Sequence, residues 1–534
     1  MPSENHSHYY YSNGERIPLI PIKDMVAVKI DENVNQVNLF NEEGEIQKPL
    51  FDIPRYGIQV FNNESEDGKR LISFNEGDIN PMGTVPIFKK SENDPNIMVA
   101  DNKFIVQFKP NVTKDQIDKL NEANNVKIVK SLGYAENGYV LQTETGQDPM
   151  KVINVANIYY ESGLTVFSHP NFIRERHLMS VMDETPVVTE DSTAESFLSQ
   201  QWHLKTAKVI DAWEITKGNP NVKIAILDDG IAIEHPEFRN KVVYQYDFEK
   251  DEPDGRPKVL NNDVCSPRFR GDPGPFDDCH GTACAGVATA SGVKAYGAAP
   301  KCSLMAVRTP KLLGLAEEAE MFQTVTDNGA DVISCSWGPG KRNGHLFKLD
   351  DNVRIAFEYC VTNGRNGKGT IILFAAGNYS EDTSLNGYTT NPNVLAIAAS
   401  NSNEERASYS NFGKEVWVCA PSSDGAKRIF TTDVPREDGY NRGNPANGDS
   451  IGYYTNGFGG TSSSTPLVAG IVALILSVNP SLNWKQVRDI LARTADKIGE
   501  QNTYRNTPLG QHSTLFGYGR INALKALQEA QQIH

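Results

Sequence analysis

A glycine-rich turn in the last quarter of the chain places a serine at the start of an apolar helix. The segment GGTSSSTP spans 459–466, contains Ser462, and runs directly into LVAGIVALILSV. We expect Pro466 in the first helical turn, where its missing N–H costs nothing. A hydroxyl there faces unpaired backbone N–H groups and the positive end of the helix dipole, which favour a developing negative charge. Taken alone, the segment predicts only an N-cap serine.

Three upstream segments place possible partners for this serine at the ends of secondary-structure elements. VKIAILDDG is a buried strand that ends at Asp228, FDDCHGTACAG puts His280 at the start of a close-packed helix, and Asn378 follows the strand GTIILFAAG. A buried carboxylate can orient an imidazole, which can take a serine proton, and an amide can donate to an oxyanion. Each residue also has an ordinary structural interpretation, as a turn aspartate, a cap or core histidine and a turn asparagine.

The order Asp, His, Ser along the chain is the order of subtilisin. Residues 195–525 resemble subtilisin-like serine proteases, with the closer likeness to the kexin and furin branch, and they resemble the calcium-dependent proteases of bacteria. The motifs that carry this resemblance are DDG at 228–230, HGTACAG at 280–286, SCSWGP at 334–339, TPLVAG at 465–470, QQW at 200–202 and FGYGRINA at 516–523.

The resemblance implies a serine endopeptidase that cuts polypeptides through an acyl-enzyme. It implies Ser462 as nucleophile, His280 as general base and then acid, and Asp228 as the group that orients His280. Asn378 and the N–H of Ser462 would form the oxyanion hole. The substrate-binding residues implied in the same way are Asp229, Asp278, Ser336, Trp337 and Gly338.

The alternative function is a catalytically inactive protease fold that serves as a binding module. Such proteins usually lack a triad member or the oxyanion amide, whereas this chain has all four residues. A cysteine-protease interpretation of Cys279 or Cys284 is disfavoured, because Ser462 already occupies the nucleophile position.

Composition is that of a globular protein with room for two or three domains: 534 residues, 39% hydrophobic and 22% charged. The net charge of −15 argues against nucleic acid as a partner and suits calcium. The longest apolar run, 467–478, is too short to span a bilayer, so we expect no membrane partner and a monomer. No signal peptide is visible, which indicates the cytoplasm by default, with the periplasm or leaderless secretion as alternatives.

The fold class expected for residues 199–534 is α/β: a subtilisin-like, doubly wound, mostly parallel sheet with helices on both faces. The catalytic residues would lie at its carboxyl edge. The expected strands are 222–228, 303–308, 331–336, 369–375 and 394–399, and the expected helices lie near 281–290, 315–329, 350–363, 465–478 and 484–495.

The N-terminal part predicts a prodomain. Residues 99–177 follow a βαββαβ pattern, and this ferredoxin-like α+β module resembles the inhibitory propeptide of subtilisin-like zymogens, so the chain would inhibit itself. Residues 1–98 carry short strand signals (MVAVKI, GIQVF, RLISF) and form a β-rich extension. Residues 178–198 are polar and acidic and predict a linker, with autoprocessing anywhere from Arg174 to Ser199.

Calcium is the expected cofactor. The acidic loop with Asp247, Glu252 and Asp254 supplies the oxygen ligands that calcium prefers, and the resemblance implies a site there. It implies another at Glu195 and Glu237, where the family has aspartates.

Specificity is left open by the sequence. The positions where kexin-like enzymes carry acidic pocket residues read GKRN at 340–343 and Asn386, and Asn411 replaces an expected pocket calcium ligand. A basic P1 residue, the one that supplies the scissile carbonyl, and a broad preference both remain open.

Overall fold

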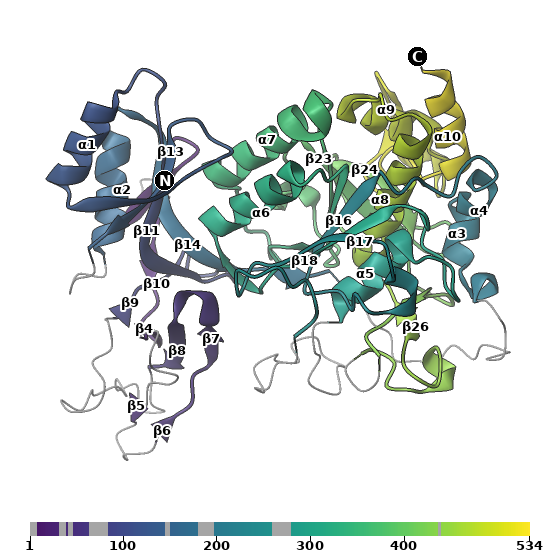
Figure 1. Cartoon of the computed structure of the whole chain (residues 1–534), viewed down its shortest axis with the longest axis horizontal. Helices are drawn as coiled ribbons and strands as arrows, with labels where there is room; N and C mark the ends of the chain where they lie inside the picture. Colours follow the sequence, from purple (N-terminus) through teal and green to yellow (C-terminus); the bar gives the residue numbers. More distant parts are fainter. Residues whose placement is uncertain are drawn as a thin grey trace. The chain divides into compact units, whose positions relative to one another are not determined.

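The computed structural model describes residues 8–30, 39–40, 46–63, 84–144, 150–179, 197–258, 279–435 and 439–533. The chain divides into two compact units. The first comprises residues 1–175 with the short segments 312–323 and 350–356, and the second comprises the rest. The expected modules 1–98 and 99–177 therefore fall into one unit, apart from residues 176 and 177. Figure 1 labels the elements of both units.

The first unit contains the βαββαβ order that the sequence predicts. Its strands are antiparallel and lie in the order β14, β11, β13, β12, which is the ferredoxin-like arrangement. Thr113 begins α1 with a capping box, in which its side chain and that of Gln116 each accept the other's backbone N–H. The elements are β11 (Met98–Phe108), α1 (Lys114–Ala123), β12 (Val126–Ser131), β13 (Gly138–Thr143), α2 (Lys151–Glu161) and β14 (Thr165–Glu175).

A small antiparallel sheet in the order β7-β8-β4-β9 forms the extension. The expected strands MVAVKI and GIQVF correspond to β4 and β8, while RLISF lies outside the described residues. The strands of the extension are β1 (Tyr9–Ser12), β2 (Glu15–Pro18), β3 (Ile20–Pro21), β4 (Met25–Lys29), β5 (Leu39–Phe40), β6 (Ile46–Gln47), β7 (Phe51–Ile53), β8 (Ile58–Asn62), β9 (Thr84–Val85) and β10 (Ile87–Lys89).

Two segments from later in the chain belong to this first unit because β14 binds them. β19 (Leu312–Gly314) pairs antiparallel with the end of β14. Asn171 on β14 accepts the N–H of Ala316 at 2.8 Å, and Arg174 lies 2.7 Å from Asp350 in a buried ion pair. The helices α6 (Leu315–Asp327) and α7 (Asp351–Gly367) both begin in these segments.

The second unit is built on a parallel sheet of seven strands in the order β17-β18-β16-β20-β22-β23-β24. The five expected strands form its centre, and their buried side chains show that both faces are covered. The expected fold class is confirmed; the two edge strands β17 and β24 were not expected. The strands are β16 (Lys223–Asp228), β17 (Val242–Asp247), β18 (Ser303–Arg308), β20 (Val332–Cys335), β22 (Ile371–Ala375), β23 (Val394–Ser400) and β24 (Val416–Pro421).

The helix α8 (Thr461–Val478) packs against five strands of this sheet and against α5 (His280–Thr289). Among the described residues it is the helix long and apolar enough to cross a membrane, but 89% of that stretch is buried inside the structure. It is therefore the core helix of the unit. The other elements are β15 (His177–Leu178), α3 (Trp202–Thr206), α4 (Val209–Ala212), β21 (Trp337–Gly338), β25 (Ile429–Thr432), β26 (Tyr454–Phe458), α9 (Trp484–Thr494), β27 (Tyr504–Thr507), β28 (Gly510–Ser513) and α10 (Ala523–Gln532).

Candidate active site

Asp228 and His280 form a buried pair at the carboxyl edge of the sheet. Asp228 is the last residue of β16, His280 is the first of α5, and Nδ1 of His280 lies 2.7 Å from Oδ1 of Asp228. Because a carboxylate only accepts, Nδ1 carries the proton and Nε2 is left as the basic nitrogen. Burial alone would lower the pKa of His280, but the charge of Asp228 outweighs it and raises that pKa above its usual value. Nε2 has no hydrogen-bond partner among the described residues.

Asp229 holds the start of α5. One of its oxygens accepts the N–H of His280 at 3.1 Å and the other accepts the N–H of Gly281 at 2.6 Å. The sequence assigned Asp229 to a substrate subsite; its described contacts instead cap the helix that carries His280. Asp278, assigned to the same subsite, lies outside the described residues.

Cys284 lies one helical turn after His280 on α5. Its sulfur lies 3.8 Å from Nδ1 of His280, and Asp228, His280 and Cys284 offer ligand atoms within 4.8 Å of one another. Burial raises the pKa of the Cys284 thiol well above its ordinary value, so the thiol stays protonated. A protonated thiol is a poor metal ligand and a poor nucleophile.

Ser462 lies in the first turn of α8, one residue after Thr461. Its hydroxyl donates to the backbone oxygen of Ser336 at 3.2 Å, and the hydroxyl of Ser336 donates back to the backbone oxygen of Ser462 at 3.2 Å. In this state the hydroxyl is directed to Ser336 rather than to His280. The hydroxyls of the next two serines make other hydrogen bonds. That of Ser463 donates to the backbone oxygen of Gly460 and contacts the hydroxyl of Ser422, and that of Ser464 donates to the backbone oxygen of Ala420.

Pro466 lies in the second turn of α8, not in the first as expected, because the helix already begins at Thr461. A residue at this position would normally donate its N–H to the backbone oxygen of Ser462, four residues earlier. Proline has no N–H, so this oxygen is available to other donors. It accepts from Ser336 Oγ at 3.2 Å and from Cys284 Sγ at 3.5 Å. The proline therefore helps to tie the serine turn to α5 and to the strand end at Ser336.

Two donors converge on a single carbonyl oxygen beside Ser462. The backbone N–H of Ser462 and the Nδ2 amide of Asn378 donate to the carbonyl oxygen of Met179 at 3.2 and 2.5 Å. The orientation of the Asn378 amide is set by Thr461, whose N–H and hydroxyl both donate to Oδ1 of Asn378 at 2.9 and 2.8 Å. This is the arrangement of an oxyanion hole occupied by a peptide carbonyl.

The segment that ends at Met179 lies along the edge of β21 as an added strand. His177 pairs with Gly338 and Leu178 with Trp337, and the N–H of Met179 donates to the backbone oxygen of Ser336 at 2.9 Å. The structure thus brings together Ser336, Trp337 and Gly338, which the sequence assigned to substrate binding.

Sequence reasoning did not single out Met179, because residues 178 and 179 were placed in the expected linker. The available signal was the apolar pair Leu178 and Met179, directly before the polar stretch 180–198.

The loop that carries Asn378 is held by hydrogen bonds from backbone N–H groups to the side chains of Asn411 and Glu381. Oδ1 of Asn411 accepts the N–H groups of Tyr379 and Glu381 at 3.0 Å each, and its Nδ2 donates to Ala376 at 3.0 Å. The Glu381 carboxylate accepts the N–H groups of Arg342 and Asn343. Asn411 thus spans the loop with its amide, at the position where the sequence raised the question of a pocket calcium ligand.

The acidic loop after β17 surrounds a lysine. Nζ of Lys258 lies 3.9, 3.4 and 2.6 Å from carboxylate oxygens of Asp247, Glu252 and Asp254. Burial would raise the pKa of Asp254, but hydrogen bonds from Lys258 and Arg256 lower it to about 2. One cation is thus accommodated among all three carboxylates, so this donor set fits a hard cation such as calcium.

The Glu237 carboxylate is surrounded by hydrogen-bond donors, whereas the carboxylates after β17 surround a lysine. It accepts six hydrogen bonds from N–H and O–H donors, at 2.7 to 3.0 Å. Calcium needs converging oxygens, whereas here hydrogen-bond donors converge on a carboxylate, so Glu237 does not fit the expected role of a calcium ligand. Glu195, its expected partner, lies outside the described residues. The six donors to the Glu237 carboxylate are Ser291, Gly292, Val293, Lys294, Ala295 and Tyr454.

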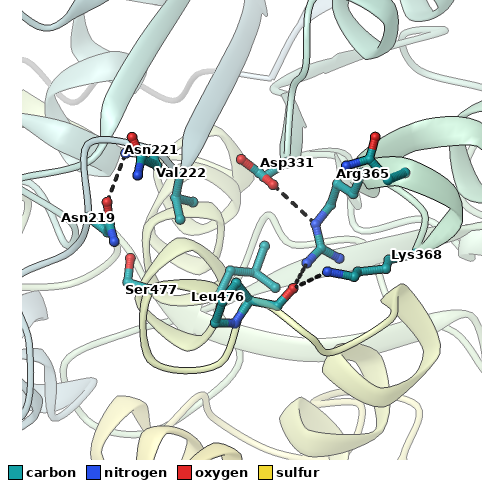
Figure 2. Close-up of a pocket in the computed structure, with 10 residues that line it drawn as sticks. Asn219, Asn221, Val222, Asp331, Arg365, Lys368, Leu476 and Ser477 are labelled. Atoms are coloured by element: carbon teal, nitrogen blue, oxygen red, sulfur yellow. Dashed lines mark hydrogen bonds and ion pairs between the residues drawn. The ribbon is translucent and has the colours of Figure 1, made fainter.

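A separate pocket of about 250 Å³ lies at the opposite edge of the sheet (Figure 2). Val222, which lines it, directly precedes β16, whereas Asp228 ends that strand, so the pocket and the catalytic groups lie a strand length apart. Nε of Arg365 donates to Asp331 at 3.1 Å and Lys368 donates to the oxygen of Pro480 at 3.0 Å. The lining cations are thus bound to the protein itself.

Comparisons with known proteins agree with this geometry. The sequence profile described as "Subtilase family" matches residues 219–519. A protein named "Calcium-dependent protease" from Nostoc sp. is 38% identical over 434 residues, which cover 76% of this chain and 59% of the relative. A "Dibasic-processing endoprotease" from Schizosaccharomyces pombe is 27% identical over 455 residues, covering 80% of this chain and 59% of the relative. The chain thus spans about three-fifths of the length of these relatives.

Among solved structures, fervidolysin from Fervidobacterium pennivorans, described as a keratinolytic enzyme related to subtilisin, is similar with a TM-score of 0.61. The two are 22% identical, and the match covers 81% of this chain and 61% of that one. At this identity the likeness concerns the fold.

The contacts of Glu237 generate a stability prediction. In a Glu237→Gln variant, an amide NH2 would face backbone N–H groups, so we expect a cost of about 2–4 kcal/mol and a lower midpoint of thermal unfolding. The pKa of Glu237 is lowered despite burial, because the loop N–H groups bind the charged form. The charged Glu237 carboxylate therefore stabilises the folded state at every pH above the ordinary pKa of glutamate. This stabilisation is lost as the pH falls through the lower pKa that Glu237 has in the folded chain.

Thermal unfolding of both chains between pH 3 and pH 8 tests this, with Glu234→Gln as the matched control. Glu234 is an exposed carboxylate in the same loop, paired with Arg256 at 3.1 Å, and its change should alter the midpoint little. Equal midpoints for the two variants would contradict the prediction.

Proposed function

Since the chain belongs to the subtilase family, we propose that it is a serine endopeptidase made as a zymogen and dependent on calcium. One observation carries the proposal: Asp228 and His280 lie in hydrogen-bond contact beside a serine whose N–H, with the Asn378 amide, binds a peptide carbonyl oxygen. This combination supplies a base, its orienting carboxylate, a nucleophile and an oxyanion site.

In the first step, Oγ of Ser462 attacks the carbonyl carbon of the substrate and gives its proton to Nε2 of His280. The hydroxyl must first leave the Ser336 oxygen, to which it donates at 3.2 Å, and turn toward the imidazole. Asp228 keeps the proton of His280 on Nδ1 and stabilises the imidazolium ion that forms.

The oxyanion of the tetrahedral intermediate would be held by Ser462 N–H and Asn378 Nδ2. Thr461 fixes the Asn378 amide beforehand, so little reorganisation is needed when charge develops. Loss of a comparable side-chain donor in subtilisin costs about 3–4 kcal/mol of transition-state stabilisation.

Collapse of the intermediate breaks the C–N bond, and His280 gives its proton to the leaving amine. Water then attacks the acyl-enzyme ester and gives its proton to His280. The ester bond to Ser462 breaks, the proton returns to Oγ, and the new carboxylate leaves.

The N-terminal unit would serve as an intramolecular inhibitor. Support comes from its ferredoxin-like strand order and from the chain that leaves it, since β14 ends at Glu175 and the next four residues end at the carbonyl bound in the oxyanion site. The zymogen would thus carry its own peptide at the catalytic groups.

Calcium would be held by Asp247, Glu252 and Asp254, with Lys258 displaced from among them. The ion would offset two of the three carboxylate charges, with Arg308 paired to Asp247, and it would stabilise the loop after β17 without taking part in bond cleavage. The name of the Nostoc relative supports a calcium requirement.

Ser462→Ala removes the nucleophile. We expect the native chain to shed its N-terminal part and to hydrolyse azocasein, and the variant to stay intact and to hydrolyse it about 10⁶-fold more slowly. Intact mass spectrometry and azocasein release test both. If both chains stay intact and inert, the fold serves as a binding module and the proposal fails.

Asp228→Asn tests the pair that orients His280. We expect kcat/KM for a peptide substrate to fall about 10⁴-fold, as it does when an amide replaces the triad carboxylate elsewhere. Because Asp228 raises the pKa of His280, the native half-maximal pH should lie above 6.5, with activity rising as His280 loses its proton, and it should be lower in the variant. Asp211→Asn, an exposed aspartate of the same unit, should leave the pH profile unchanged; an equal shift in both variants would refute the assignment.

Asp254→Asn tests the calcium site. Calcium at 100 times its Kd adds about 2.7 kcal/mol to the stability of the folded state, so the unfolding midpoint of the native chain should rise by about 5 °C in calcium relative to chelator. The variant should lose most of this rise, while Asp489→Asn, a partly exposed carboxylate paired with Arg488, should keep it. A full response in Asp254→Asn would place the calcium elsewhere.

A further inference from the structure

Residues 176–179 are bound at the active site as a substrate would be. We propose that the bond between Met179 and Ser180 is the bond that this enzyme cuts in its own chain, and that its P1 pocket selects a long apolar residue such as methionine. The inference rests on the proposed serine-protease function and adds to it the cleavage site and the substrate class.

The register of the bound segment is set by several independent contacts. His177 and Leu178 pair with Gly338 and Trp337, Met179 N donates to Ser336, and Met179 O accepts from both oxyanion donors. The Met179 side chain is 1% exposed, whereas its neighbours on the strand are half-buried. A slip of one residue would turn Met179 to the opposite face of the strand, so the geometry selects one carbonyl.

Arg176 holds the upstream end of the segment. Its N–H donates to the backbone oxygen of Lys311 at 2.8 Å, and its guanidinium lies 4.8 Å from the centre of the Trp337 ring. A cation over an indole face is an attractive contact. The segment is therefore bound through four consecutive residues, which suits an extended peptide substrate with a basic residue three positions before P1.

The cleavage follows directly from this placement. Oγ of Ser462 bonds to the carbonyl carbon of Met179 and its proton passes to His280; the C–N bond to Ser180 then breaks and His280 protonates the new α-amino group. Water hydrolyses the Met179 ester, which leaves a carboxylate on Met179 and restores the proton on Ser462. All reacting groups belong to one chain, so the first turnover needs no second molecule.

The side chain of Met179 ends beside Gly338. A Cβ added at Gly338 would lie 2.8 Å from Cε of Met179 and 3.6 Å from Nδ2 of Asn386. The absent side chain at Gly338 therefore makes the space that the end of the methionine fills. Asn386 is buried and its Oδ1 accepts the N–H of Tyr388, so the Asn386 group that lies near the Gly338 Cβ position is the donor Nδ2. An NH2 donor at this place offers no negative charge to balance the guanidinium of an arginine or the ammonium of a lysine at P1.

The first test identifies the bond in the full-length chain. Intact mass and N-terminal sequencing of the processed native chain should give fragments ending at Met179 and beginning at Ser180. Met179→Asp should slow this cleavage at least about tenfold, while Met179→Leu should retain it. Met182→Asp, the same change three residues later in the sequence, is the matched control and should also retain it.

The second test measures specificity with the mature enzyme, using p-nitroanilides of the sequence Arg-His-Leu-X. We expect kcat/KM at X = Met to exceed that at X = Arg at least about tenfold. In Gly338→Ala, the preference should shift from Met toward Ala at X, because the new methyl group fills the end of the pocket. If the substitution only damaged the structure, kcat/KM would fall by the same factor for both substrates.

The outcomes separate this inference from the proposed function. If the native chain hydrolyses azocasein but is processed at another bond, is not processed, or cuts the Arg peptide as fast as the Met peptide, the inference is wrong while the protease function stands. If the native chain behaves like Ser462→Ala in every assay, both fail.

Discussion

The hydrogen bonds from Thr461 to the Asn378 amide connect the start of α8 to the end of β22, and the geometry of the site depends on them. They fix which end of the amide faces the carbonyl of Met179, and they hold the serine turn at the carboxyl edge of the sheet. Pro466 adds a second connection, to α5 and to the strand end at Ser336, because the Ser462 oxygen that it leaves without a helical partner accepts from Ser336 and Cys284. Parallel strands bring their carboxyl ends to one edge, and here that edge supplies Asp228, Ser336 and the turn before Asn378.

Four carboxylates of the second unit are stabilised by three kinds of partner: an imidazole, backbone N–H groups and cationic side chains. Asp228 is bound to an imidazole, Asp229 to the N–H groups at the start of α5, and Glu237 to a loop of backbone N–H groups. At Asp247 the partners are Arg308 and Lys258. The partners of Glu237 are N–H and O–H donors, whereas the carboxylates around Lys258 lie beside a cation, and this is the site proposed for calcium. This contrast is why the calcium proposal concerns the loop after β17 and excludes Glu237.

Specificity and self-processing depend on the same few contacts. The edge of β21 pairs with extended backbone of the chain's own segment, and in the proposed protease it would bind other peptides in the same way. Selectivity would then depend on the space available to the P1 side chain. Beside Met179, that space is left by the absent side chain of Gly338, with Asn386 nearby. The loop that carries Asn378 is held by Asn411 and Glu381, whose side chains accept backbone N–H groups.

The sequence alone determined the family, the parallel sheet and the segments of the site. A strand or helix with a clear apolar pattern adjoins each of the four site residues, Asp228, His280, Asn378 and Ser462. Such a pattern can be read from the sequence without knowledge of tertiary contacts. The edge strands β17 and β24 were not recognised, because an edge strand lacks a partner on one side and its pattern is weaker.

Tertiary structure alone decided which groups meet. Glu237 and Asp247 are both acidic residues beside polar segments, and only the folded chain shows donors around one and cationic side chains beside the other. Asp229 caps α5, since this helix begins within reach of its carboxylate, and its expected role at a substrate subsite stays a prediction. Met179 lies 283 residues before Ser462, and no local pattern encodes a contact over that separation (462 − 179 = 283). Its place at the catalytic serine follows from strand addition to β21, which depends on backbone groups that every residue carries.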